Sequence, residues 1–218
     1  MVLQRAVEII DGALPESEFV RPGGSLLMMA GLPGTGKSSI VSELAKLLPF
    51  VHVSTDGVRL RLREQPTYTA AEMTLVYEIC FSIIERRLRR GQRVVFDASN
   101  YLAARREHLV KLAQRSGAPV AVCLVQASQE AISRRLFKRS TGQRHDHDLS
   151  DADWAVYQWM VEAQEPVVEE HIPLDTTYTP TDELARKLYE YWLRIEASAT
   201  SDPDLQSPGW AKQLGRPD

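Results

Sequence analysis

Short apolar runs alternate with longer segments of helical periodicity along most of this 218-residue chain. The apolar runs are bounded by Gly, Pro, Asp or Ser, which is typical of strands buried on both faces of a sheet. The runs lie at 25–30, 50–54, 93–97, 119–126 and 171–175. Because helical segments separate them, we expect parallel strands joined by helical crossovers, which make a three-layer α/β/α sandwich.

The helical segments carry apolar residues at three- and four-residue steps. The clearest covers 70–90, where Thr69-x-x-Glu72 has the pattern of a capping box and Gly91 ends the segment. Asn100 stands where it can cap the next helix.

Two further helices are expected nearer the C-terminus. Ser150-x-x-Asp153 precedes a segment in which Trp159, Met160 and Ala163 are expected to face inward, and Thr179-Pro180 begins the last helix.

The chain divides into three parts by composition. Residues 1–22 contain a short apolar-periodic segment that stops at Asp11-Gly12, and we expect a helix docked on the rest of the chain. Residues 23–198 form one α/β domain, and residues 199–218, rich in Pro, Gly and Ser, form a tail.

Composition is that of a globular protein, with 44% hydrophobic and 25% charged residues. The 26 basic and 29 acidic residues give a net charge of −3, which excludes a general polyanion binder. Cys80 and Cys123 lie in apolar runs and are expected to be buried thiols in a reducing compartment. Without a long apolar run or a signal-peptide pattern, we expect a soluble cytoplasmic protein with no membrane contact; the oligomeric state is left open.

The most specific motif is the run Gly-Leu-Pro-Gly-Thr-Gly-Lys-Ser at 31–38, which matches the phosphate-binding loop (P-loop) pattern G-x-x-x-x-G-K-[ST] in full. A strand precedes it and a helix follows, which argues against a mere connecting turn. Backbone N–H groups of such a loop cradle phosphates, the lysine reaches the β- and γ-phosphates, and the serine hydroxyl can bind Mg²⁺. The residues expected to contact the nucleotide are Gly31, Leu32, Pro33, Gly34, Thr35, Gly36, Lys37, Ser38 and Ser39.

Two acidic residues follow strands that would end beside this loop. Asp56 is expected near the γ-phosphate, where a carboxylate can accept a proton from an attacking hydroxyl, and Arg59 would reach the same region. The alternative is a helix cap at Asp56 with a solvated Arg59. Asp97 ends the third strand and would serve either Mg²⁺ or the acceptor, with Asn100 after it as a simple helix cap.

A basic segment, 134–150, is expected to form a lid over the nucleotide. Helical spacing places Arg135 and Arg139 on one face, so they can stabilise transferring phosphate, whereas the alternative is a solvated helix face. The run His145-Asp-His-Asp148 is expected to be a polar loop and not a metal site.

Together these motifs resemble the P-loop kinases grouped around phage-type polynucleotide 5′-hydroxyl kinase and the zeta-toxin-like kinases. The matching segments are GLPGTGKSS (31–39), STDGVR (54–59), FDASN (96–100), RRLFKR (134–139) and SDADWAVYQWMVEAQEP (150–166). The resemblance implies an adenylate-kinase-like fold with ATP as donor. It also implies that Asp56 is the general base, that Arg59 orients the acceptor, that Asp97 joins the acceptor pocket, and that Arg135 and Arg139 grip the phosphates.

We therefore expect a kinase that uses ATP and Mg²⁺ to phosphorylate a hydroxyl, with a 5′-OH nucleic-acid end as the first acceptor to consider. The phage-type enzyme has a second, phosphatase domain for which this chain has no room, and a net charge of −3 does not favour a polyanionic acceptor. A sugar, antibiotic or metabolite kinase of the same fold is the alternative. A nucleotide-dependent ATPase or switch without an acceptor is the second alternative.

Overall fold

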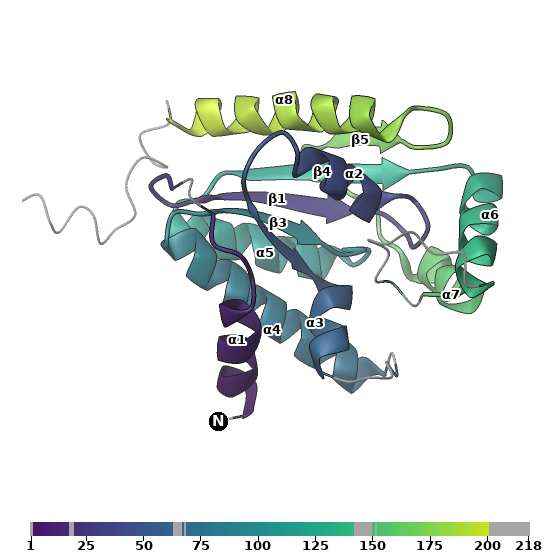
Figure 1. Ribbon diagram of the computed structural model, residues 1–218, viewed down its shortest axis with the longest axis horizontal. Coiled ribbons are helices and arrows are strands. Elements are labelled where there is room, and N and C mark those ends of the chain that lie inside the picture. Colours follow the sequence, from purple (N-terminus) through teal and green to yellow (C-terminus); the bar gives the residue numbers. More distant parts are fainter. Residues whose placement is uncertain are drawn as a thin grey trace, which may run out of the picture.

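A computed structural model describes residues 2–17, 20–62, 67, 69–141, 150 and 152–200. Five parallel strands form one sheet in the order β2-β3-β1-β4-β5 (Figure 1). The strands are β1 (Ser25–Ala30), β2 (Val51–Ser54), β3 (Arg93–Asp97), β4 (Val120–Gln126) and β5 (Ile172–Asp175). All five predicted strands are therefore confirmed, with ends that differ from the prediction by one residue or less.

Helices cover both faces of the sheet, which confirms the predicted three-layer sandwich (Figure 1). One face carries α2 (Lys37–Leu44) and α8 (Thr181–Thr200). The other carries α1 (Val2–Gly12), α4 (Ala70–Arg89) and α5 (Ala103–Ser116). The remaining helices, α3 (Thr55–Leu62), α6 (Gln129–Ser140) and α7 (Trp154–Ala163), lie toward the carboxyl edge of the sheet.

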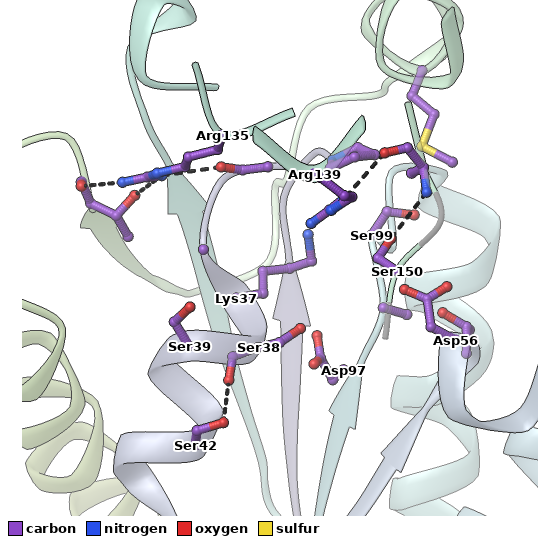
Figure 2. Close-up of a pocket in the computed structure, with 18 of the residues that line it drawn as sticks. Lys37, Ser38, Ser39, Ser42, Asp56, Asp97, Ser99, Arg135, Arg139 and Ser150 are labelled. Carbon is purple, nitrogen blue, oxygen red and sulfur yellow. Dashed lines mark hydrogen bonds between the residues drawn. The ribbon is translucent and has the colours of Figure 1, made fainter. Parts of the chain in front are cut away.

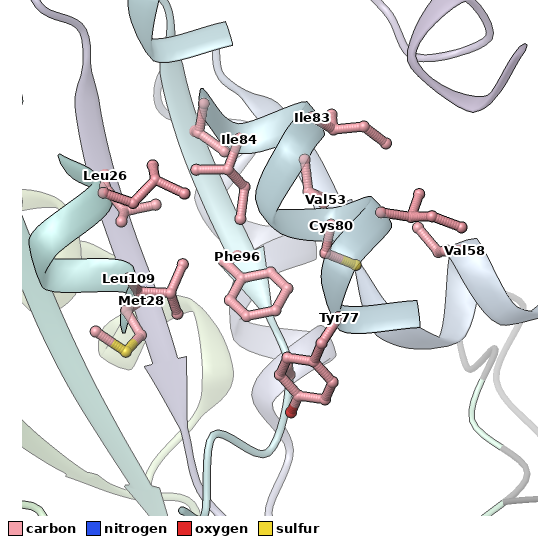
Figure 3. Close-up of a cluster of buried hydrophobic side chains, with 14 of the residues drawn as sticks. Leu26, Met28, Val53, Val58, Tyr77, Cys80, Ile83, Ile84, Phe96 and Leu109 are labelled. Carbon is pink, nitrogen blue, oxygen red and sulfur yellow. The ribbon is translucent and has the colours of Figure 1, made fainter. Parts of the chain in front are cut away.

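The core follows from the alternation of side chains along the buried strands. In β1, Leu26 and Met28 pack into the cluster beneath α4 and α5, whereas Leu27 and Met29 pack into the cluster beneath α2 and α8. Figure 3 shows the first cluster, with Phe96 of β3 lying among side chains from α4. Both faces of the sheet are thus packed against helices. This packing holds the ends of the strands in place relative to one another.

Thr69 caps α4, as predicted, by accepting from the Glu72 N–H, and the Glu72 carboxylate accepts from Arg59 and Thr67. Two other local predictions about helices are wrong. Asn100 does not cap α5: Leu102 occupies the N-cap position, and within the described residues the Asn100 amide oxygen accepts no hydrogen bond, while its amide nitrogen donates to the Met29 carbonyl. Trp159 faces outward with half of its surface exposed, whereas Met160 beside it is buried, as predicted.

Other predictions fall partly outside the described residues. The His145–Asp148 run and residues 201–218 of the tail lie there. Within the described part, no helix has both the length and the apolar content needed to cross a membrane. Cys80 and Cys123 are both free and buried, as predicted, and burial raises the pKa of each thiol.

The first helix is joined to the domain by a buried ion pair. Arg87 of α4 is 2% exposed and donates from Nε to the Asp11 carboxylate and from Nη2 to the Asp11 carbonyl. Val7 and Ile10 extend the same contact into the apolar core. The N-terminal helix therefore contributes side chains to the core of the α/β domain.

Replacing Asp11 by alanine is expected to lower the free energy of unfolding by about 3 kcal/mol, because Arg87 would remain buried without its charge partner. Urea unfolding of both proteins measures this difference. Glu16→Ala is the matched control, since Glu16 approaches Arg87 Nη1 at 3.8 Å from an exposed position. That variant should change the free energy by less than about 1 kcal/mol; equal losses for the two variants would contradict the assignment.

Candidate active site

The carboxyl ends of three neighbouring strands meet at one cavity of about 530 Å³ (Figure 2). The P-loop follows the central strand β1, Asp56 follows β2, and Asp97 ends β3. Arg135 and Arg139 of α6 line the cavity from the side of β4, which lies next to β1 on the other flank. The sheet order thus brings together segments that are far apart in the sequence, as ligand sites at the carboxyl edge of parallel sheets require.

The P-loop adopts backbone angles that depend on glycine. Gly31 has φ 138°, and a Cβ built there would stand 2.3 Å from the Val125 carbonyl oxygen. Gly36 is left-handed with φ 94° at the N-cap of α2. The chain can therefore turn tightly at the end of β1 and enter α2 with the helix N-terminus facing the cavity, which favours bound anions.

Polar contacts within the loop hold its shape. The Lys37 ammonium donates to the carbonyls of Gly31 and Leu32 at 2.8 and 2.9 Å, and the Thr35 hydroxyl donates to Leu32 O at 2.8 Å. The Gly31 N–H donates to Ser99 O at 2.9 Å, which ties the start of the loop to the segment after β3. In Figure 2 the Lys37 side chain rises from the start of α2 into the cavity.

Asp97 is buried beside Ser38, the hydroxyl residue of the P-loop motif (Figure 2). Burial by itself raises the pKa of Asp97, but the neighbouring His52 imidazole, the charge of Lys37 and the Ser38 hydroxyl outweigh it and hold this pKa below its usual value. His52 Nε2 lies 3.4 Å from Asp97 Oδ2. Asp97 is therefore an anion at neutral pH, placed against the phosphate end of the loop.

Mg²⁺ is compatible with this pair of groups. A hydroxyl and a carboxylate are oxygen donors of the kind that Mg²⁺ uses, and the ion commonly takes its other ligands from phosphates and water. Within the described ranges no group of three or more His, Cys, Asp and Glu side chains gathers as a metal cage. Ser38 and Asp97 thus fit a Mg²⁺ ion that arrives with a nucleotide.

Asp56 lies in the first turn of α3 and lines the cavity, with 29% of its side chain exposed. Arg59, one turn later, donates from Nη1 to the Asp56 carboxylate, from Nε to Glu72 at 3.0 Å and from Nη2 to the Met73 sulfur at 3.2 Å. The alternative of a solvated Arg59 is wrong, since this residue is only 3% exposed. The Arg59 guanidinium fixes the position of the Asp56 carboxylate by donating to it.

The two lid arginines both line the cavity, yet their contacts differ. Arg139 donates to Ala152 O at 3.0 Å, a contact that links α6 to the segment before α7. Arg135 instead donates to Gly34 O, Thr176 Oγ1 and Thr176 O (Figure 2). The expected shared face of α6 is present, but Arg135 is directed toward the carbonyl side of the P-loop. Residues 142–149 of the predicted lid lie outside the described ranges.

Three residues that take part in the site were not singled out by the sequence motifs. They are His52 beside Asp97, Glu72 beneath Arg59, and Thr176 at the end of β5. Only His52 carries a local signal, because it shares the strand face of Ser54 two residues before the strand ends. Glu72 and Thr176 reach the site only through the packing of α4 and β5.

A family model described as "AAA domain" matches residues 26–166, which include the P-loop, both cavity aspartates and α6. This range is well over half of the chain. The match therefore covers both flanks of the cavity as well as the loop.

Solved structures with the same fold include a gluconokinase, an APS kinase and the protein Kti12. A gluconokinase from Sinorhizobium meliloti 1021 has a TM-score of 0.57 at 20% identity, covering 84% of this chain and 99% of that chain. The Mycobacterium tuberculosis APS kinase CysC, solved with AMPPNP and APS, has a TM-score of 0.58 at 16% identity, covering 78% and 98%. Chaetomium thermophilum Kti12, solved with ADP-AlF3, has a TM-score of 0.60 at 18% identity, covering 77% and 99%. At these identities the likeness shows the fold alone, an α/β fold with a five-stranded parallel sheet in the order β2-β3-β1-β4-β5.

Proposed function

The chain belongs to the AAA-domain family, and from that premise we propose that it is an ATP-dependent kinase that phosphorylates a hydroxyl group of a small molecule. One observation carries the proposal. One cavity is lined by six residues of the P-loop segment, Pro33, Gly34, Gly36, Lys37, Ser38 and Ser39, and by the Asp56 carboxylate, which follows the strand two positions away in the sheet. A phosphate-binding loop alone would suffice for nucleotide binding, whereas a kinase also needs a group that accepts the proton of the attacking hydroxyl.

The donor half is formed by the P-loop. Its backbone N–H groups and the N-terminus of α2 would receive the phosphates of ATP, and Lys37 would exchange its loop carbonyls for phosphate oxygens. Ser38 and Asp97 would hold Mg²⁺, which supplies positive charge to the β- and γ-phosphates when it is bound. The position of Asp97 beside Ser38, the hydroxyl residue of the P-loop motif, supports the metal role over a role in the acceptor pocket.

The acceptor half is centred on Asp56. Its carboxylate would accept the hydroxyl proton as the oxygen attacks the γ-phosphorus in line with the leaving ADP. Arg59, which is bound to both Asp56 and Glu72, would orient that carboxylate and so act on the acceptor indirectly. This role differs from direct binding of the acceptor, the role implied by the family resemblance.

The lid is formed by α6. Arg139 lines the cavity together with the exposed Lys138 and would offset the charge that spreads over the phosphate oxygens during transfer. Arg135 would support the P-loop from its carbonyl side, given its contacts with Gly34 and Thr176. The two predicted lid arginines thus have different proposed roles. Arg139 would face the phosphates, and Arg135 would position the loop.

A small-molecule acceptor is favoured over a 5′-OH nucleic-acid end. A cavity of about 530 Å³ is of the size that encloses a compact ligand. Two of the structural neighbours are named as a gluconokinase and an APS kinase, both of which act on small molecules. A net charge of −3 offers little long-range attraction to a polyanion.

The test is transfer of labelled γ-phosphate from Mg–ATP to two sets of acceptors: a pool of sugars, polyols and hydroxyl metabolites, and a 5′-hydroxyl oligonucleotide. Label in the metabolite pool is the expected result. Label on the oligonucleotide alone would replace the proposal by a polynucleotide kinase. ATP hydrolysis that neither set changes would indicate a nucleotide-dependent ATPase or switch.

A further inference from the structure

Thr176 is a buried threonine that directly follows β5. Its hydroxyl contacts the P-loop and α6, and its backbone contacts the end of β4. Its Oγ1 donates to the carbonyl of Thr35 in the P-loop at 2.7 Å and accepts from Arg135 Nη1 of α6 at 2.8 Å. Its backbone N–H donates to Gln126 O at the end of β4 at 3.0 Å. Only 8% of the residue is exposed. The single hydrogen of this hydroxyl is thus donated inside the protein and one of its lone pairs accepts there, and we call this group of contacts the Thr176 junction.

Arg135 strengthens the junction from the side of α6. Its Nη1 donates to Gly34 O at 3.1 Å as well as to the Thr176 hydroxyl, and its Nη2 donates to Thr176 O at 2.7 Å. Hydrogen bonds from a charged donor are stronger than those between neutral groups. Two consecutive carbonyls of the P-loop, those of Gly34 and Thr35, are therefore held on the side of Thr176 and Arg135.

The direction of these carbonyls sets the direction of the loop amides. Because a peptide unit is planar and trans, the Thr35 carbonyl and the Gly36 N–H point in opposite directions. Holding Thr35 O against Thr176 therefore turns the Gly36 N–H the other way. Gly36 also faces the Thr176 methyl group, since a Cβ at Gly36 would stand 3.4 Å from Thr176 Cγ2. Thr176 thus contacts the loop through its hydroxyl, while its methyl group lies on the side of Gly36 that a Cβ would occupy.

Two further hydrogen bonds link the N-terminus of α6 to residues 175–177. Ser128, the N-cap of α6, donates its N–H to Thr177 Oγ1 at 2.8 Å, and the Thr177 N–H donates to Asp175 Oδ1 at 2.7 Å. The first turns of α6 are therefore attached to the end of β5 at two points, Ser128 and Arg135. Their position relative to the P-loop depends on residues 175–177.

We propose that Thr176 is a positioning residue for nucleotide binding: it sets the orientation of the P-loop peptide at Thr35–Gly36 and fixes α6 to that peptide through Arg135. The inference goes beyond the proposed kinase activity, because it concerns binding of the nucleotide and holds whether or not an acceptor follows.

The experiment measures the affinity for Mg–ADP by calorimetry in the parent protein and in three variants. Thr176→Val keeps the shape but removes the hydroxyl, and it should weaken binding about tenfold. Thr176→Ser restores the hydroxyl and should stay within about threefold of the parent. Thr74→Val is the matched control, since Thr74 is exposed on α4 and its hydroxyl donates only to Ala70 O within the helix; its affinity should not change.

Two further measurements separate positioning from a general loss of stability. The Gly36 amide resonance of the nucleotide-free protein should shift in Thr176→Val and keep its position in the control, because the peptide that carries this amide loses its hydrogen bond to Thr176. In a double-mutant cycle with Arg135→Met, the combined loss of affinity should be smaller than the product of the single losses, because both residues act through one junction. Arg135→Met also tests the junction if Thr176→Val does not fold.

Parental affinity for Mg–ADP in both Thr176→Val and Arg135→Met would overturn the inference, and so would independent, multiplicative losses. A weakened affinity that tracks a lowered unfolding temperature, with an unchanged Gly36 amide resonance, would overturn it as well. The result is separate from that of the transfer assay: failure to phosphorylate any acceptor would contradict the proposed kinase activity and leave these affinities unaffected.

Discussion

Replacing Asp56 by asparagine is expected to slow phosphoryl transfer about a thousandfold, while Mg–ATP still binds with nearly parental affinity. The carboxylate is the proposed acceptor of the hydroxyl proton, and an amide of the same shape cannot take that proton. The proposed nucleotide contacts are made by the P-loop and do not include Asp56. The measurement is labelled phosphate transfer to the best acceptor of the metabolite pool, with calorimetry for Mg–ATP alongside.

The fold should tolerate this change because Arg59 keeps a second carboxylate partner. Its Nε donates to Glu72 at 3.0 Å, so the guanidinium stays paired when Asp56 loses its charge. Asp182→Asn is the matched control, since Asp182 is an exposed aspartate in the first turn of α8 that pairs with Arg186. Transfer at the parental rate in the Asp56 variant would show that another group accepts the proton.

Replacing Lys37 by alanine is expected to weaken Mg–ATP binding about a hundredfold, because hydrogen bonds to charged groups contribute roughly 1.5–3 kcal/mol each. Transfer should fall further than binding, since the ammonium also offsets charge that develops on the phosphate oxygens during the reaction. The Asp56→Asn variant should therefore lose transfer activity but keep its affinity for Mg–ATP, whereas the Lys37→Ala variant should lose both.

Lys46→Ala provides the control for charge. Lys46 lies just beyond α2 with its ammonium paired to Glu43 on the exposed surface, so its removal changes the net charge equally without touching the P-loop. Its affinity for Mg–ATP should remain parental. If Lys37→Ala bound Mg–ATP as tightly as Lys46→Ala, the P-loop would not be the nucleotide site.

Local patterns predicted most of the secondary structure because the elements are short and strongly patterned. The strand 25–30 is almost wholly apolar and wholly buried, and its alternate residues pack into two different clusters. The predictions failed where a side chain bonds to a residue that is distant in the sequence. Asn100 donates to the carbonyl of Met29, 71 residues away, and its amide oxygen does not cap the helix that follows it.

The donor half of the site was likewise predictable, because the P-loop is one continuous segment whose chemistry depends on residues in fixed order. The sequence also placed Asp56 and Asp97 at strand ends, and the parallel sheet brings both to the cavity. It assigned Arg59 and Arg135 to ligands, whereas the described contacts of Arg59 are with Asp56, Glu72 and Met73, and those of Arg135 are with Gly34 and Thr176. An arginine's charge is visible in the sequence, but the direction of its long side chain is not.

By itself, then, the sequence determined the order of the strands and of most helices, the phosphate-binding loop and the two acidic strand ends, all of which depend on neighbours within a few residues. Only the tertiary structure decided which of these groups share a cavity, that His52, Lys37 and Ser38 lower the pKa of Asp97, and that Thr176 contacts a loop 141 residues away in sequence. The physical reason is that hydrogen bonds, burial and charge act over a few ångströms in space. The packing of the sheet and its helices sets those distances, and no local pattern along the chain records them.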